Sequence, residues 1–144
     1  MMDFFVRPAI TKDVKALYEF VCELNADCSP ETVKKSLWRI IEDETQEIFA
    51  AVGGNSLLGI LHLRIVNNIF EDDFVEIAAF AVGESYRRMG SGTLLLKTAE
   101  CWCSQSFYKR IRFVYGNRYP ELRDFLLRYG YEENSLGELN KSII

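Results

Sequence analysis

The sequence contains few residues of the kinds that hold metal ions or cross-link small proteins. It has one histidine and four cysteines, and no two cysteines have the C-x-x-C spacing of a zinc or redox site. We therefore expect no metal cofactor, and we expect the cysteines to be reduced and mostly buried.

An excess of basic residues and a long apolar run are also missing. The net charge is -4 and the isoelectric point is about 5.1, so electrostatic attraction to nucleic acid or to an anionic membrane is not favoured. No apolar run approaches the roughly 20 residues that cross a bilayer, and the opening MMDFFVRP does not resemble a secretion signal. These absences predict a cytoplasmic protein without a nucleic-acid or membrane partner.

The chain does contain enough apolar sequence for one folded domain. Its 144 residues are 49% hydrophobic and 26% charged, which is the balance of a globular domain with a sizeable core. No repeat, low-complexity segment or linker interrupts it. We predict a single domain over residues 1–144.

Apolar periodicity predicts the order of strands and helices. A first strand leads into a helix over 11–24 with Thr11 as its N-cap, and Ser29 and Pro30 begin a second helix that runs to about residue 43. The buried face of that second helix is predicted at Val33, Leu37, Trp38 and Ile41. Three apolar segments follow and predict an antiparallel meander over 47–53, 56–66 and 74–82.

The second half of the chain alternates helices and strands. We predict a helix from about residue 90 to 106, a strand over 110–116, a helix over 119–131 and a short strand within 136–144. The predicted order is β-α-α-β-β-β-α-β-α-β, an α/β (α+β) domain.

The segment SYRRMGSGTLLL, residues 85–96, joins the end of a strand to the start of a helix. A helix N-terminus offers unpaired amides and the positive end of a dipole, and Gly90 and Gly92 let those amides approach phosphate oxygens. Arg87 and Arg88 add positive charge. The segment predicts a polyphosphate site, although the glycines of such a turn can also serve backbone geometry alone.

Two common nucleotide motifs do not fit this segment. A P-loop requires a lysine after its last glycine, and none follows Gly92. A dinucleotide fingerprint requires a third glycine, and Leu95 stands at that position.

RRMGSG does match the R/Q-x-x-G-x-G/A pattern at Arg87, Gly90 and Gly92. Together with VRPAITKDV near the start and FLLRYGYEE near the end, it resembles the GCN5-related N-acetyltransferase (GNAT) superfamily over nearly the whole chain. The resemblance implies a mixed, mainly antiparallel sheet flanked by helices. It also implies direct transfer of an acetyl group from acetyl-coenzyme A to a primary amine in a ternary complex.

The resemblance also implies which residues bind acetyl-coenzyme A. The backbone of Phe80, Ala81 and Val82 would pair with the pantetheine arm between the fourth and fifth strands. Asn117 resembles an asparagine that contacts the pantetheine. It lies two residues earlier than the superfamily's usual spacing between this asparagine and the terminal Gly-aromatic pair. The pyrophosphate would be bound beside Arg87 by the amides of Arg88, Met89, Gly90, Ser91, Gly92 and Thr93, with the Thr93 hydroxyl as a further donor.

Acetyl transfer needs a base that takes a proton from the amine. VEIAAFAV resembles the histone acetyltransferase branch of the superfamily, which implies that Glu76 is this base. Strand alternation would place Glu76 with Phe80 and Val82 on one face if no bulge intervenes, and a glutamate at a solvent-facing sheet edge is the alternative. His62 is a second candidate because its ordinary pKa suits base catalysis, although it could equally be an exposed or buried structural histidine.

The acid that protonates the departing thiolate is where the chain departs from the pattern. The superfamily's usual tyrosine stands four residues before the terminal glycine, and Leu126 occupies that position. Tyr129, Tyr119 and Tyr115 are nearby in sequence, and no spacing selects among them. Tyr129 is our candidate, and packing in the core is its alternative.

The sequence leaves the acceptor and the activity class open. Acidic residues of the first two helices and of EDD at 71–73 would suit a cationic acceptor, although ordinary surface loops carry such residues as well. The alternatives are a coenzyme A-binding sensor without transferase activity, which the leucine at position 126 favours, and a transferase for another acyl group or for a protein amine. A homodimer is possible, as in many relatives.

Overall fold

The computed structural model describes residues 3–24, 27–87 and 89–143. Seven strands form one sheet in the order β1-β2-β3-β4-β5-β7-β6. All neighbouring strands are antiparallel except β4 and β5, which are parallel. This confirms the α/β fold class, the mixed sheet and the antiparallel meander expected from the sequence.

The elements follow the predicted order with one addition, the two-residue strand β6. Short 3-10 turns cover Thr11–Asp13 and Glu84–Tyr86. The helices and strands are β1 (Phe5–Pro8), α1 (Val14–Glu23), α2 (Pro30–Glu42), β2 (Gln46–Gly53), β3 (Ser56–Val66), β4 (Phe74–Val82), α3 (Ser91–Gln105), β5 (Arg110–Phe113), α4 (Pro120–Arg128), β6 (Glu132–Glu133) and β7 (Leu139–Ser142).

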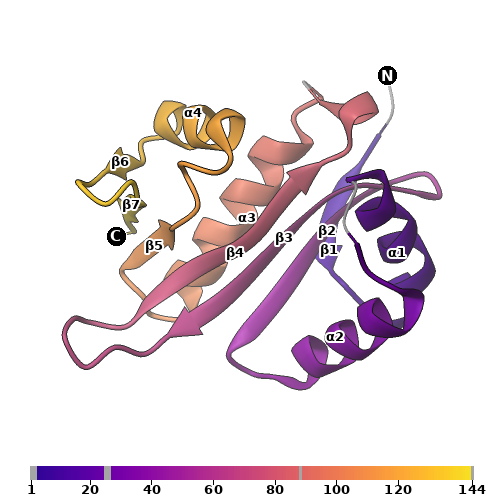
Figure 1. Ribbon diagram of the computed structural model, residues 1–144, viewed down its shortest axis with the longest axis horizontal. Coiled ribbons are helices and arrows are strands. Elements are labelled where there is room, and N and C mark those ends of the chain that lie inside the picture. Colours follow the sequence, from indigo (N-terminus) through magenta and orange to yellow (C-terminus); the bar gives the residue numbers. More distant parts are fainter. Residues whose placement is uncertain (1–2, 25–26, 88, 144) are drawn as a thin grey trace.

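The sheet separates two apolar cores. One core contains buried residues of α3 and α4, including Leu95 and Leu126, packed against the sheet. The other joins α1 and α2 to the opposite face, where Leu37 of α2 meets Ile48 of β2. Figure 1 shows α1 and α2 in front of β1 and β2, with α3 behind the sheet. No helix in the described ranges is long and apolar enough to span a membrane.

The helix starts show where local signals determined the structure. The Ser29 hydroxyl accepts a hydrogen bond from the Thr32 amide at 3.1 Å, which confirms the predicted cap of α2. The cap predicted at Thr11 is wrong, because Thr11 lies in a 3-10 turn and α1 begins at Val14. The Asp13 carboxylate holds this turn by accepting hydrogen bonds from the Ile10 amide at 2.8 Å and from the two terminal guanidinium nitrogens of Arg7.

The strands β4 and β5 diverge along their length. They pair only at Val75 with Ile111 and at Glu76 with Arg112, whereas β4 continues to Val82. Figure 1 shows β5 beside the first half of β4 and the chain then turning away toward α4. The second half of β4 therefore has a backbone edge that β5 does not cover.

Candidate functional site

The site begins where β4 ends and α3 starts. Gly90 precedes the first helical residue with a φ of 88°, a left-handed conformation that favours glycine. The amide of Leu94 makes the first helical bond, to the Gly90 carbonyl at 3.0 Å. The amides of Ser91, Gly92 and Thr93 precede that bond, so they are the donors that a helix N-terminus offers to an anion.

The surroundings of Gly92 leave room for a Cβ atom, so packing of the fold does not require a glycine at this position. A Cβ atom would lie 3.4 Å from Val82 Cγ2 and 3.6 Å from Phe125 Cζ, which are ordinary contacts. Ser91 is buried beside it, and its hydroxyl has no hydrogen-bond partner in the described structure. The absence of a side chain at Gly92 keeps the amides open to a ligand, which fits a phosphate group.

The other predicted residues of this loop are placed as follows. The Arg87 guanidinium is exposed and lies 3.4 Å from the Glu121 carboxylate of α4. Met89 is half-buried, and Arg88 lies outside the described residues. Because Arg87 and Glu121 are both well exposed, their ion pair is weak and Arg87 can turn toward an anion.

Thr93 and Tyr129 connect the loop to α4. Their hydroxyl oxygens lie 2.6 Å apart, and the Tyr129 ring packs on Phe125 with centroids 4.8 Å apart. Phe125 in turn meets the edge of Phe80 from β4 at 5.7 Å. Tyr129 therefore lies beside the first turn of α3. Phe80 and Val82 pack against the core on the α3 side of the sheet.

A bulge in β4 changes which residues share a face. His62 pairs with Ala79 and Leu63 pairs with Ile77, so Ala78 is an extra residue without a partner on β3. Glu76 pairs with Arg64 on the same side of the sheet as His62, and this is the face that α1 and α2 pack on. The grouping of Glu76 with Phe80 and Val82 was expected only without a bulge, and the bulge places Glu76 on the opposite face from them.

Glu76 and Arg64 form an ion pair on this face. Arg64 Nε lies 2.6 Å from Glu76 Oε2, and the Glu76 side chain is 7% exposed while that of Arg64 is 47% exposed. Glu76 is therefore a buried carboxylate held by a partly exposed cation, which excludes the alternative of a free glutamate at a sheet edge.

His62 is held by a neighbouring amide. Its Nε2 lies 2.8 Å from Gln46 Oε1, and Gln46 Nε2 donates to Asp43 Oδ2 at 2.8 Å. Burial lowers the pKa of His62 below its ordinary value, the charge of Arg64 lowers it further, and the charge of Glu76 partly opposes them. The imidazole is therefore neutral at pH 7, in the form that can accept a proton.

The remaining candidates lie after β5 and on α4. Asn117 is exposed and packs against Gly137, where a Cβ atom would lie 2.6 Å from Asn117 Nδ2. Leu126 is fully buried in the core. Tyr115 lies two residues after β5 and packs on the edge of Phe113, with ring centroids 6.0 Å apart.

Comparison with known proteins identifies the family. The sequence profile of the acetyltransferase (GNAT) family matches residues 14–131. The chain belongs to the acetyltransferase (GNAT) family. No curated protein matches it in sequence.

Solved structures share the fold of this GNAT acetyltransferase at low identity. A GNAT acetyltransferase from Streptococcus pneumoniae is 16% identical with a TM-score of 0.77, covering 99% of this chain and 100% of that one. The PaiA N-acetyltransferase from Thermoplasma acidophilum, in complex with coenzyme A, is 16% identical with a TM-score of 0.76, covering 98% and 99%. AAC(6')-Iy with a bisubstrate analogue is 14% identical with a TM-score of 0.80, covering 91% and 92%.

Three residues beside the candidate bases were not identified from the sequence. Arg64, Gln46 and Asp43 reach the candidate bases only through strand pairing and a loop, and no local pattern marks them. Tyr115 could be named from the sequence but not chosen over Tyr119. The one available signal was the presence of a basic residue, Arg64, and an acidic residue, Glu76, on two strands predicted to be neighbours. Pairing them required the register of β3 against β4, which the bulge determines.

Proposed function

We propose that the protein transfers an acetyl group from acetyl-coenzyme A to a primary amine by direct attack in a ternary complex. The observation that carries this proposal is the divergence of β4 from β5 after Glu76, directly before the Gly90 turn and α3. It supports one continuous path, with the pyrophosphate at the amides of α3, the pantetheine along Phe80, Ala81 and Val82, and the acetyl group near the bulge.

Bound acetyl-coenzyme A supplies a thioester carbon that an amine can attack. A carbon–nitrogen bond forms, the carbon–sulfur bond breaks, one amine proton goes to a base, and coenzyme A leaves as a thiolate that takes a proton. Ala78 has no partner across β3, so a backbone amide at the bulge is the donor that we assign to the developing oxyanion.

The two candidate bases differ in what already binds them. The Glu76 carboxylate already accepts a short charge-assisted hydrogen bond from Arg64. His62 is neutral because burial lowers its pKa. We assign His62 as the base, and we assign Glu76 to holding Arg64 and to setting the charge beside His62.

Tyr129 and Tyr115 lie in different parts of the site, and we assign them different roles. Tyr129 bonds to Thr93 at the start of α3, which supports a role in binding phosphate. Tyr115 lies two residues after β5, where the chain has separated from β4, which supports a role in protonating the thiolate. Asn117 packs beside Gly137 in the segment after β5, and its contact with the pantetheine stays a prediction.

The proposal can be tested with coenzyme A binding and acetyl transfer measured in parallel. Calorimetry measures binding of acetyl-coenzyme A, and mass spectrometry detects acetylated polyamines, aminoglycosides, amino acids and lysine peptides. Mass spectrometry is preferable to a thiol reagent because Cys22 and Cys101 are exposed and would react with it. Binding with amine-dependent acetylation is expected. Binding without acetylation would support a coenzyme A sensor instead, and no binding would overturn the site.

The cellular setting is also part of the proposal. All four cysteines, which lie in the described ranges, are free thiols, and this supports a reducing compartment such as the cytoplasm. Light scattering of the purified protein would test the homodimer expected from the resemblance.

A further inference from the structure

A fixed chain of hydrogen bonds leads from a surface carboxylate to the only histidine of the protein. Asp43 follows α2, Gln46 begins β2, and His62 lies on β3. Gln46 joins the other two, with 2.8 Å from its Nε2 to Asp43 Oδ2 and 2.8 Å from its Oε1 to His62 Nε2.

Asp43 determines the direction of the Gln46 amide. Its Oδ1 accepts the Thr45 amide at 2.8 Å and the Thr45 hydroxyl at 2.6 Å, and these bonds keep the pKa of Asp43 below its ordinary value. An ionised carboxylate can only accept hydrogen bonds. The NH₂ group of Gln46 must therefore face Asp43, and its oxygen must face His62.

The direction of Gln46 determines the tautomer of His62. An amide oxygen only accepts, so His62 Nε2 must carry a proton and donate it. In the neutral ring the other nitrogen, Nδ1, then has the free lone pair. The geometry therefore fixes which atom of the histidine can accept a proton.

We propose that Asp43 and Gln46 are positioning residues that hold His62 in the tautomer whose Nδ1 atom takes the proton from the acceptor amine. The proposal rests on the proposed acetyl transfer. In a serine-protease triad, an aspartate bonds directly to the catalytic histidine and holds its tautomer. Here the Gln46 amide lies between the carboxylate and the histidine and transmits the same constraint.

Two further charged groups face His62. They affect the pKa of the imidazole, whereas the bond to Gln46 determines which nitrogen carries the proton of the neutral ring. Arg64 lies two residues along β3, and Glu76 lies on β4 in an ion pair with Arg64. Their charges act on the pKa of His62 in opposite directions. Asp43 is the acidic group that reaches the ring through a hydrogen-bonded neighbour.

The substitution Asp43→Asn should reverse every bond in this chain. The Thr45 amide can only donate, so the oxygen of the new side chain stays at the Oδ1 position and its NH₂ group faces Gln46. Gln46 then turns its oxygen toward that NH₂ group and its own NH₂ group toward His62. His62 Nε2 must become an acceptor, and the proton moves to Nδ1.

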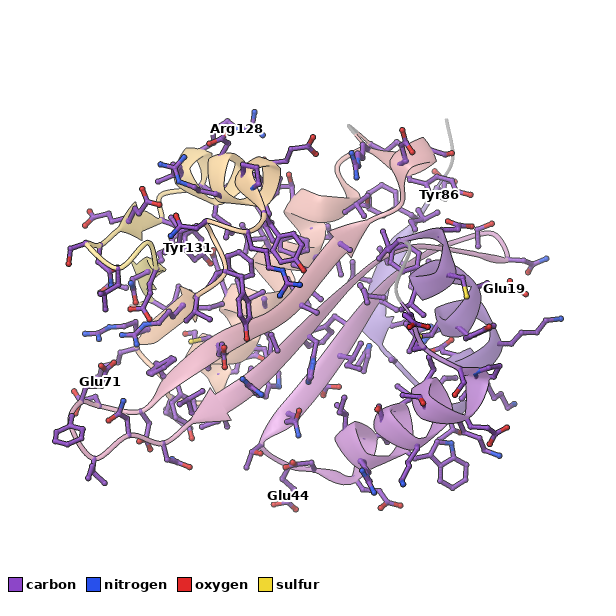
Figure 2. All side chains as sticks on the ribbon, in the orientation of Figure 1. Glu19, Glu44, Glu71, Tyr86, Arg128 and Tyr131 are labelled. Atoms are coloured by element: carbon purple, nitrogen blue, oxygen red, sulfur yellow. The ribbon has the colours of Figure 1, made fainter. Side chains whose placement is uncertain are left out.

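The single histidine makes the test direct. Histidine-selective ¹⁵N labelling of the protein without a histidine tag gives one imidazole, whose nitrogen shifts above its pKa report the tautomer. We expect Nε2–H in the unmodified protein and Nδ1–H in Asp43→Asn, with kcat lower on the order of 100-fold. The matched control is Glu44→Gln, which removes the same charge one residue along the loop, and it should keep Nε2–H. Figure 2 shows Glu44 at the edge of the molecule, pointing outward.

Each result decides the proposal. A proton on Nδ1 in the unmodified protein, an unchanged tautomer in folded Asp43→Asn, or an inverted tautomer with unchanged kcat would overturn it. If Asp43→Asn does not fold, Gln46→Met removes the acceptor at Nε2 while keeping the side-chain length. A share of Nδ1–H should then appear, and an unchanged ring would overturn the proposal. The tautomer is measured without a substrate, so a failure of acetyl transfer is distinguished from a failure of this chain of bonds.

Discussion

The hydroxyl oxygens of Thr93 and Tyr129 lie 2.6 Å apart and join the first turn of α3 to the C-cap residue of α4. The same tyrosine ring packs on Phe125, which meets Phe80 at the uncovered end of β4. Three elements that surround the proposed phosphate position are thus connected by two hydroxyls and three aromatic rings. Tyr129 takes part in this connection, whereas Tyr115 packs on Phe113 after β5, so we expect the two tyrosines to have different functions.

We expect Tyr129→Phe and Tyr115→Phe to affect different kinetic constants. Loss of the Tyr129 hydroxyl removes one hydrogen bond beside the proposed phosphate position, worth about 1 kcal/mol, so KM for acetyl-coenzyme A should rise roughly fivefold with kcat unchanged. Loss of the Tyr115 hydroxyl should lower kcat with little change in KM. Steady-state kinetics of the two variants side by side measures this. The reverse pattern would make Tyr129 the acid, as the sequence alone had indicated.

Gly92→Ala should weaken binding without weakening the fold. Its Cβ atom would meet only ordinary contacts, whereas a methyl group among the amides of α3 would obstruct a phosphate. We expect an unchanged or higher melting temperature and at least a tenfold loss of acetyl-coenzyme A affinity, about 1.4 kcal/mol.

The comparison variant for this prediction is Gly90→Ala. Its left-handed φ makes any side chain strained, so it should lose about 1 kcal/mol of unfolding free energy as well as affinity. Calorimetry with coenzyme A and thermal melts test both variants. Unchanged affinity in Gly92→Ala would contradict the phosphate site.

The fold was predictable where the determining interactions are local. Ser29 and Pro30 gave the start of α2 because a capping bond and a proline act within one turn. The helix start predicted at Thr11 was wrong because Asp13 bonds to Arg7 of β1 and holds Thr11 in a 3-10 turn. This is a tertiary contact that the local sequence does not reveal. Trp38 and Ile41, predicted on the buried face of α2, are exposed because the sheet covers only the narrower stripe that contains Leu37.

The position of the loop from Arg87 to Thr93 between β4 and α3 could be predicted on the same principle, because the loop is one continuous segment. The environments of Glu76 and His62 depend on the pairing of β3 with β4, and one extra residue at Ala78 decides which face each side chain takes. Alternation alone cannot locate a bulge, and the bond between Gln46 and His62 joins residues from different strands.

His62→Gln should lower kcat on the order of 100-fold while leaving the affinity for acetyl-coenzyme A unchanged. In the unmodified protein the acid limb of kcat should lie below pH 6.5, because burial lowers the pKa of His62 from that value. A kcat profile from pH 5 to 9 measures this. An acid limb that remains in His62→Gln would belong to another group.

The same pKa shift predicts how stability depends on pH. Because the folded pKa of His62 is below its unfolded value of 6.5, the unfolded chain binds more protons between the two values. The contribution of His62 to the free energy of unfolding is therefore complete above pH 6.5 and is lost as the pH falls through the lower, folded pKa. Urea unfolding at several pH values should show this loss in the unmodified protein, and the difference from His62→Gln should shrink accordingly.

Substitutions of the ion pair beside His62 should move the acid limb of kcat in opposite directions. The charge of Glu76 raises the pKa of His62, so Glu76→Gln should shift the limb to lower pH and preserve the plateau at high pH. The charge of Arg64 lowers that pKa, so Arg64→Gln should shift the limb to higher pH, and the new amide can still donate to Glu76. If Glu76 were itself the base, Glu76→Gln would instead lower kcat at every pH, and the plateau would be lost. Opposite shifts with both plateaus kept would therefore assign the proton to His62 and leave Glu76 as the charge that tunes it.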